Sequence, residues 1–195
     1  MQTTVRLKDQ TEVLIRPMTQ DDAAKSLAFF RALPEEDRAC LRRDVTRPEL
    51  IEERLREMEQ GRAKRLVAIA GDEIVADGAL EITPYGWEKH IGELRLIVAR
   101  PYQKRGLGVF MARALLDLAA TEQIEELVVK MMRSQAPAQS IFRRLGFHEE
   151  LLLRDYVRDG HGRKQDLVLM RSKLQELIEE LDDYLAELDD HARRS

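Results

Sequence analysis

The sequence predicts a mixed α/β fold: a mostly antiparallel sheet of about seven strands, flanked by helices and followed by a C-terminal amphipathic helix. Three observations lead to this fold class. Short apolar runs bounded by turn residues predict strands, and segments with helical periodicity lie between them. The 195 residues, of which 44% are hydrophobic, suffice for one full core. A sheet covered by helices satisfies this order of elements.

The expected strands are short and end at turn residues. The first two alternate as a hairpin that Pro17 closes, and Gly71-Asp72 separates the next two. Strands are expected at residues 5–7, 12–16, 66–70, 74–82, 93–98, 127–131, 147–153 and 166–170.

The expected helices carry start and stop signals. Thr19 marks the start of the first helix, and Pro34 and Pro48 open the next two. The fourth helix is strongly amphipathic, and Gly146 follows the end of the fifth. Helices are expected at residues 23–33, from Pro34, and at 48–60, 107–120 and 137–145.

The last segment differs from the rest, so the chain is divided into a domain of residues 1–171 and an acidic amphipathic helix over 172–195. An apolar stripe runs along this helix: Leu174, Leu177, Ile178, Leu181, Leu185 and Leu188. Two interpretations stay open. The stripe docks on its own domain, or it forms a homodimer through a short coiled coil.

Composition narrows the functional classes. A net charge of −4 gives no basic field for nucleic acid. The single cysteine, Cys40, rules out an internal disulfide and fits a reducing cytoplasm. No apolar signal core begins the chain and no run of 18 apolar residues occurs, so no membrane segment is expected. The four histidines are scattered, so no metal site is expected.

The stretch from Val98 to Val109 is the most informative one. A strand ends at Val98, and a basic glycine loop, Gln103-Lys104-Arg105-Gly106-Leu107-Gly108, opens a helix. Glycines let backbone N–H groups converge, and a helix N-terminus favours negative charge, so the loop suits a phosphate. Lys104, Arg105 and Arg100 are expected to strengthen the attraction. The loop matches neither the Walker pattern nor the dinucleotide fingerprint.

This loop resembles the Q/R-x-x-G-x-G/A pyrophosphate loop of GCN5-related N-acetyltransferases. Residues 135–147, which end in Leu145-Gly146-Phe147, resemble the second signature of that family. The resemblance implies the fold of that family, an N-acetyltransferase activity and acetyl-CoA as cosubstrate. It also implies cofactor contacts from these residues: Leu96, Ile97 and Val98 to pantetheine, Lys104, Arg105, Gly106, Leu107, Gly108 and Val109 to the pyrophosphate, and Gln135. Phe142 replaces the tyrosine that protonates the thiolate in many members.

Amine acetylation requires a base, because an ammonium must lose its proton before it attacks. Glu93 is the candidate, since it lies on the strand that in this family splays to admit the cofactor. Burial in an apolar cleft is expected to raise the pKa of such a carboxylate. Two alternatives stay open: Glu93 and Arg95 form only a surface pair, or Glu81 is the base.

A second resemblance concerns the acceptor. Residues 11–17, Asp21-Asp22, Phe29-Phe30 and 93–98 resemble the catalytic domain of bacterial protein lysine acetyltransferases. This resemblance implies a protein lysine as acceptor. A small-molecule amine acetyltransferase and a non-catalytic acyl-CoA-binding module are the alternatives. Residues 31–65 are expected to cover the acceptor side, and their alternating charges to form a solvated face.

Overall fold

The fold was taken from a computed structural model, which describes residues 2–183. Its sheet has eight strands in the order β1-β2-β3-β4-β5-β6-β8-β7, and each of the eight expected strand ranges overlaps one of them. All neighbouring strands are antiparallel except β5 and β6. The strands are β1 (Thr3–Arg6), β2 (Glu12–Pro17), β3 (Ala63–Ala70), β4 (Glu73–Ile82), β5 (Ile91–Val98), β6 (Glu126–Met132), β7 (His148–Arg158) and β8 (Lys164–Lys173).

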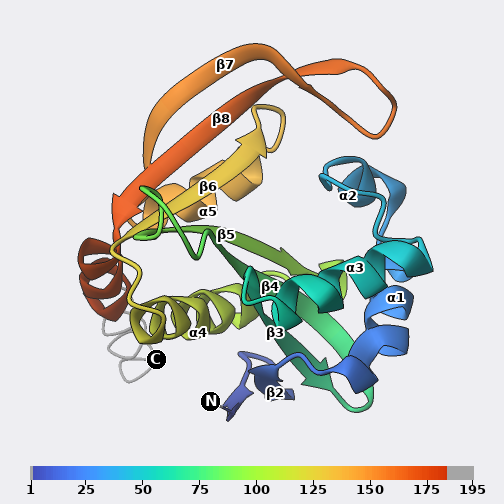
Figure 1. Cartoon of the computed structure of the whole chain (residues 1–195). Helices are drawn as coiled ribbons and strands as arrows, with labels where there is room; N and C mark the ends of the chain where they lie inside the picture. The colour runs from blue at the N-terminus through green and yellow to red at the C-terminus, as the bar shows by residue number, and fades with distance from the viewer. Residues whose placement is uncertain (1, 184–195) are drawn as a thin grey trace.

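Every expected helix is present, with ends shifted by a few residues at most. The helices are α1 (Ala23–Ala32), α2 (Glu35–Ala39), α3 (Pro48–Glu59), α4 (Leu107–Thr121) and α5 (Ala136–Arg144), with short 3-10 turns η1 (Gln20–Asp22) and η2 (Arg100–Tyr102). A further helix begins at residue 174 and continues to the end of the described chain. The mixed fold with helices on both faces is confirmed (Figure 1).

Each face of the sheet carries its own core. On one face α4 packs so closely that a Cβ added to Gly78 would lie 3.1 Å from both Leu115 and Met111. The opposite face is covered by α1 and α3, where Phe30 and Ile51 pack against Val67. Helix α3, which belongs to residues 31–65, therefore covers this face of the central strands together with α1. That this face is the acceptor side stays a prediction.

The C-terminal helix docks on its own domain over the described residues. Leu174, Leu177 and Leu181 are buried in the core that α4 forms with the sheet. Leu185 and Leu188 lie outside the described residues. The homodimer and the division at residue 172 stay predictions.

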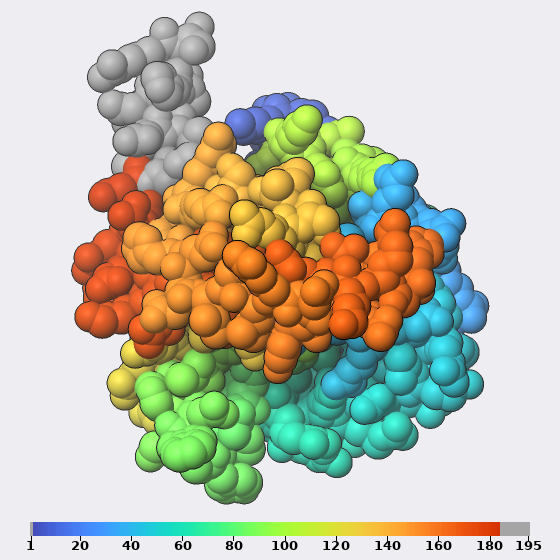
Figure 2. Space-filling model, turned by 90° about the horizontal axis from the view of Figure 1, so that it is seen from above, coloured from blue at the N-terminus to red at the C-terminus, as the bar shows by residue number. Residues whose placement is uncertain are grey.

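Two features of the sheet position the site. Strands β5 and β6 pair for only three residues, from Ile91 to Glu93, and then diverge (Figure 1). The hairpin of β7 and β8 is longer than expected and crosses the molecule toward α2 (Figure 2). At its turn the Gly160 N–H donates to the Ala39 carbonyl at 3.0 Å. The gap between β5 and β6 is thus bridged at its far end.

Candidate active site

The glycine loop presents a row of free backbone donors. Gly106 caps the N-terminus of α4 with φ of 95°, and Lys104 has φ of 60°. Within the described chain, no hydrogen bond from the N–H groups of residues 104–108 to a protein acceptor is recorded. A Cβ on Gly108 would meet nothing within 4 Å. Free donors at a helix N-terminus fit a pyrophosphate.

The basic side chains near the loop are arranged differently from the expectation. Arg100 points to α2 and donates to Glu36 at 2.8 Å and to Asp37 at 3.0 Å, so it does not serve the loop. Arg105 pairs with Asp9 and lies 5.6 Å from the ring centroid of Tyr102. Of the three basic residues considered, Lys104 alone has no recorded ion pair within the described chain.

The edge of β5 beyond Glu93 is open toward β6. Leu96, Ile97 and Val98 pair with β4 on one side only, because β6 has already diverged. The Val98 carbonyl accepts a hydrogen bond from Gln103 Nε2 at 2.9 Å. An incoming amide can thus add to this edge as a further strand would, except that it competes with Gln103 at Val98.

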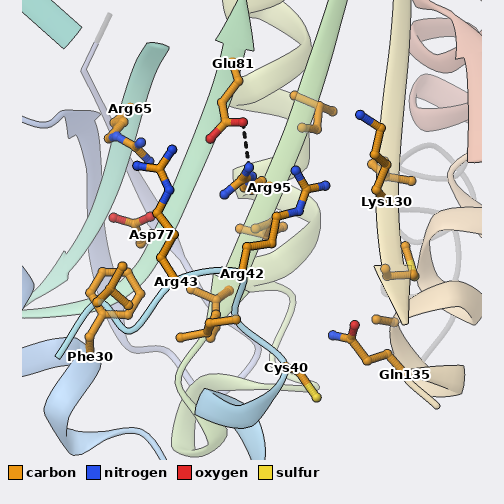
Figure 3. Close-up of a pocket in the computed structure, with 18 of the residues that line it drawn as sticks. Phe30, Cys40, Arg42, Arg43, Arg65, Asp77, Glu81, Arg95, Lys130 and Gln135 are labelled. Carbon is orange, nitrogen blue, oxygen red and sulfur yellow. Dashed lines mark hydrogen bonds and ion pairs between the residues drawn. The ribbon is translucent and has the colours of Figure 1, made fainter. Parts of the chain in front are cut away.

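A cavity of about 160 Å³ crosses the sheet through this gap. On the α4 side its walls are apolar and include Leu94, Leu96, Met131 and Phe142. On the α1 and α3 side its walls are charged (Figure 3). The cavity therefore joins the open edge of β5 to the face that residues 31–65 cover.

Two glutamines and Phe142 shape the far end of the gap. Gln135 lines the cavity, and its Oε1 accepts from the Met132 N–H at 2.9 Å. Gln139 is buried and donates to the carbonyls of Met132 and Arg133. Phe142 stacks edge-on against Phe147 at 5.4 Å. These contacts hold the end of β6 in place. The oxygen of the Gln135 amide is used by Met132, so its NH₂ group can donate to a ligand.

Glu93 lies at the last paired position before the strands diverge, and its side chain is only 15% exposed. It binds Lys130 Nζ at 2.9 Å and also pairs with Arg42. Burial would raise the pKa of Glu93, but Arg42 and Lys130 outweigh it, and the pKa lies below its ordinary value. The expectation of a raised pKa is wrong, because the cleft on this side is cationic rather than apolar.

Glu81 faces Glu93 across β4 and β5, at the position directly opposite in the register. Arg95 lies between them, with Nη2 2.7 Å from Glu81 and Nε 4.0 Å from Glu93. The pair of Glu93 and Arg95 is partly buried, so it is not the surface pair considered as an alternative. Glu81 lines the cavity, and both carboxylates line the open groove beside it.

The charged wall contains residues that the sequence reading missed. Six cations line the cavity and are called the cationic lining: Arg42, Arg43, Arg54, Arg65, Arg95 and Lys130. Arg54 is 5% exposed and binds Asp77 at 2.6 and 2.7 Å, so the expected solvated face is wrong there. The sequence does contain a signal for buried charge here, because Arg65 and Asp77 lie in strands that are otherwise mostly apolar.

No group of three or more His, Cys, Asp or Glu side chains that could hold a metal ion was found in residues 2–183. Over the same span, no helix has the length and apolar character needed to cross a membrane.

Solved structures with the same fold include three acetyltransferases. Mycobacterium smegmatis RimJ, in complex with CoA-disulfide, has a TM-score of 0.74 at 20% identity and covers 94% of this chain and 93% of its own. The GNAT domain of S. lividans PAT has a TM-score of 0.70 at 19% identity, covering 88% and 96%. Spermidine N-acetyltransferase from Vibrio cholerae, in complex with CoA and spermine, has a TM-score of 0.72 at 16% identity, covering 85% and 98%.

At these identities the likeness shows the fold alone. No curated protein sequence gives a significant match. The family model described as the acetyltransferase (GNAT) family matches residues 29–147, which is more than half of the chain. The matched span contains the glycine loop, the open edge of β5, and helix α5 with the Gly146 that follows it. The chain belongs to the acetyltransferase (GNAT) family.

Proposed function

We propose that this protein transfers the acetyl group of acetyl-CoA to the side-chain amine of a protein lysine. The observation that carries the proposal is the cavity through the β5–β6 gap, which connects the open strand edge to Glu81. Glu93 is the register partner of Glu81 and lines the adjoining groove. A donor held on one face of the sheet and an acceptor arriving on the other meet there. Bringing the two reactants together in this way is itself a large part of catalysis.

Acetyl-CoA supplies the activated thioester, and this chain supplies its binding surface. The free N–H groups of residues 104–108 hold the pyrophosphate, and Leu96, Ile97 and Val98 hold the pantetheine amides through the open edge of β5. Gln135 offers its NH₂ group at the far end of the gap. Val109 belongs to the first turn of α4, where its N–H is used by the Gly106 carbonyl, so it contributes packing.

Glu93 is proposed as the group that takes the acceptor proton, directly or through a water molecule. Transfer depends on the difference between the pKa of the acceptor ammonium and that of Glu93. Arg42 and Lys130 lower the pKa of Glu93, which weakens it as a base. The same cations disfavour the charged form of an amine beside them, so the ammonium also becomes more acidic. The lowered pKa of Glu93 disfavours proton transfer, whereas the lowered pKa of the ammonium favours it.

The departing thiolate has no tyrosine to protonate it, because Phe142 stands at that position. We propose that the thiolate leaves without a dedicated acid. A thiol is far more acidic than an alcohol, with an ordinary pKa of about 8.5 for cysteine, so its anion is a stable leaving group.

A protein lysine fits the shape of the acceptor side. The cavity adjoins an open groove of about 600 Å³ that runs over Glu88, Glu93 and Glu150. A polypeptide can lie along the groove while one side chain enters the narrower cavity. A small-molecule amine is the second candidate, because the cavity alone, at about 160 Å³, would hold only a small acceptor.

The test is acetyl transfer by the purified protein. We expect CoA release with lysine peptides, with mass spectrometry placing the acetyl group on the lysine side chain, and little release with short alkylamines. Release with small amines only would favour the second candidate. Acetyl-CoA binding without CoA release on any amine would overturn the proposal.

A further inference from the structure

The cationic lining holds more positive charge than its carboxylates neutralise. Four carboxylates contact its six cations in or beside the cavity: Glu57, Asp77, Glu81 and Glu93. Glu57 serves both Arg43 and Arg65, and Glu93 serves both Arg42 and Lys130. A fifth carboxylate, Glu53, lies 3.4 Å from Arg43 at the rim. The site therefore retains a positive excess.

The buried guanidinium groups also have unused donors. In the described structure, the Nε atoms of Arg54, Arg65 and Arg95 are buried without a hydrogen-bond partner. Arg65 is 6% exposed and lines the cavity. A buried N–H that lacks a partner is unfavourable, and more so on a charged group. A ligand that accepts hydrogen bonds would satisfy such donors.

Like charges are also crowded in this site. The guanidinium groups of Arg65, Arg43, Arg95 and Arg42 form a row across the cavity in Figure 3. Burial lowers the pKa of Arg65, and the neighbouring Arg54 lowers it further. Burial also lowers the pKa of Arg95, with Arg42 as the next cause. Both directions indicate that an added negative charge would be favourable here.

We propose that the cationic lining is an anion-binding subsite, which recognises a carboxylate carried by the acceptor close to the amine that is acetylated. This inference rests on the proposed function and names the class of acceptor. Guanidinium groups bind carboxylates through paired N–H donors, which gives both strength and orientation. The cavity has room for roughly five water molecules, enough for a carboxylate. Purely cationic amines such as polyamines are poor acceptors in this arrangement.

Binding of a simple anion tests the subsite without any transfer. Glutarate and its neutral diamide are titrated into the full-length protein by calorimetry. We expect the wild type to bind glutarate and not the diamide. Arg95→Gln and Arg43→Gln should each weaken glutarate binding at least tenfold. Arg56→Gln is the matched control, because Arg56 lies on α3 but is exposed and has no recorded ion pair in the described chain. It should bind as the wild type does.

Acceptor preference tests whether the subsite serves transfer. One comparison uses a lysine peptide flanked by Glu against the same peptide flanked by Gln. The other uses free lysine against lysinamide, which lacks the carboxylate. The kcat/KM ratio should favour the carboxylate-bearing partner at least tenfold in the wild type and in Arg56→Gln. The same kcat/KM ratio should fall toward one in Arg95→Gln and in Arg43→Gln. A larger ratio in the peptide comparison identifies a peptide as the source of the carboxylate, and a larger ratio in the lysine comparison identifies a free amino acid.

The outcomes separate this inference from the proposed function. Acetylation without any preference for a carboxylate, together with no glutarate binding, would overturn the subsite and leave the proposed function intact. Arginine-dependent glutarate binding, with no transfer to any amine, would support the subsite and overturn the proposed function. If Arg95→Gln does not fold, Arg43→Gln decides, because its side chain is 38% exposed and tolerates replacement more readily.

Discussion

The two faces of the sheet around β5 differ in composition. On the α4 face, Leu94 and Leu96 pack among the apolar side chains of α4 and α5. On the opposite face, Glu93 and Arg95 belong to a network of partly buried ion pairs. Alternation along one strand places both sets on β5. The comparison teaches that alternation along one strand can build an apolar surface and a charged one on opposite faces, which under the proposed function take the donor and the acceptor.

The largest expected effect tests the charged face. Glu93→Gln keeps the shape of the side chain but removes the proton acceptor, so turnover should fall by about 10²–10⁴-fold at pH 7. The loss should shrink at high pH, where the free amine forms without help. Affinity for acetyl-CoA, measured by calorimetry, should not change, because that contact lies on the other side of the gap.

Glu73→Gln is the control for this substitution, since Glu73 is exposed at the start of β4. Near-normal turnover in a folded Glu93→Gln protein would contradict the role of Glu93. Glu81→Gln would then test the facing carboxylate.

The second prediction concerns the stability of the same face. Asp77→Asn leaves the buried Arg54 without its charged partner, which should cost about 3–5 kcal/mol of the free energy of unfolding. Asp72→Asn breaks an exposed pair with Lys25 and should cost about 1 kcal/mol or less. Urea denaturation measures both. Equal losses for the two variants would show that the buried network is no more important than a surface pair.

The third prediction tests the cofactor side. Gly106→Val places a β-branched residue at φ of 95° in the loop and should weaken acetyl-CoA binding at least tenfold, about 1.4 kcal/mol. Gly86→Val is the matched control, because Gly86 has φ of 89° and open space around it, away from the loop. Calorimetry on both folded variants separates backbone strain from lost binding. The same affinity in both would refute the assigned role of the loop.

The smallest expected effect concerns the turn that bridges the gap. Burial would raise the pKa of Asp159, but hydrogen bonds from Arg163, Gln165 and the His161 N–H prevail and lower it to about 2. Because the folded pKa lies below the ordinary value of about 3.9, the stabilisation is present above about pH 4. It is lost as the pH falls through about 2.

The Gly160 amide resonance should therefore hold its position above about pH 4 and shift with a midpoint near pH 2. In Asp159→Asn that transition should disappear. A wild-type transition near pH 4 would show that these hydrogen bonds do not hold the turn.

Much of the fold and of the cofactor side was predictable because their signals are local. Gly106 and Gly108 stand within a few residues of the strand end and the helix start that give them meaning. The acceptor side was not predictable in the same way. Folding alone brings Arg42, Arg54 and Lys130 together. The sequence of a helix does not distinguish an arginine that points into water from one that pairs with a buried carboxylate such as Asp77. The pKa of Glu93 was misjudged for this reason, since neither of its cationic partners is near it in sequence.

The contact between Gly160 and Ala39 turns the gap beside Glu93 into a closed loop of main chain. A long molecule cannot enter a closed ring of main chain from the side; one of its ends must enter first. Under the proposed function, only a free tip can therefore reach the thioester: a side chain, a chain terminus or a small molecule. The main chain of a polypeptide acceptor stays at the rim of the gap. Selection among acceptors therefore depends partly on how far the side chain that carries the amine protrudes. A lysine held flat on the surface of a folded target would fail for lack of reach, whatever its neighbours.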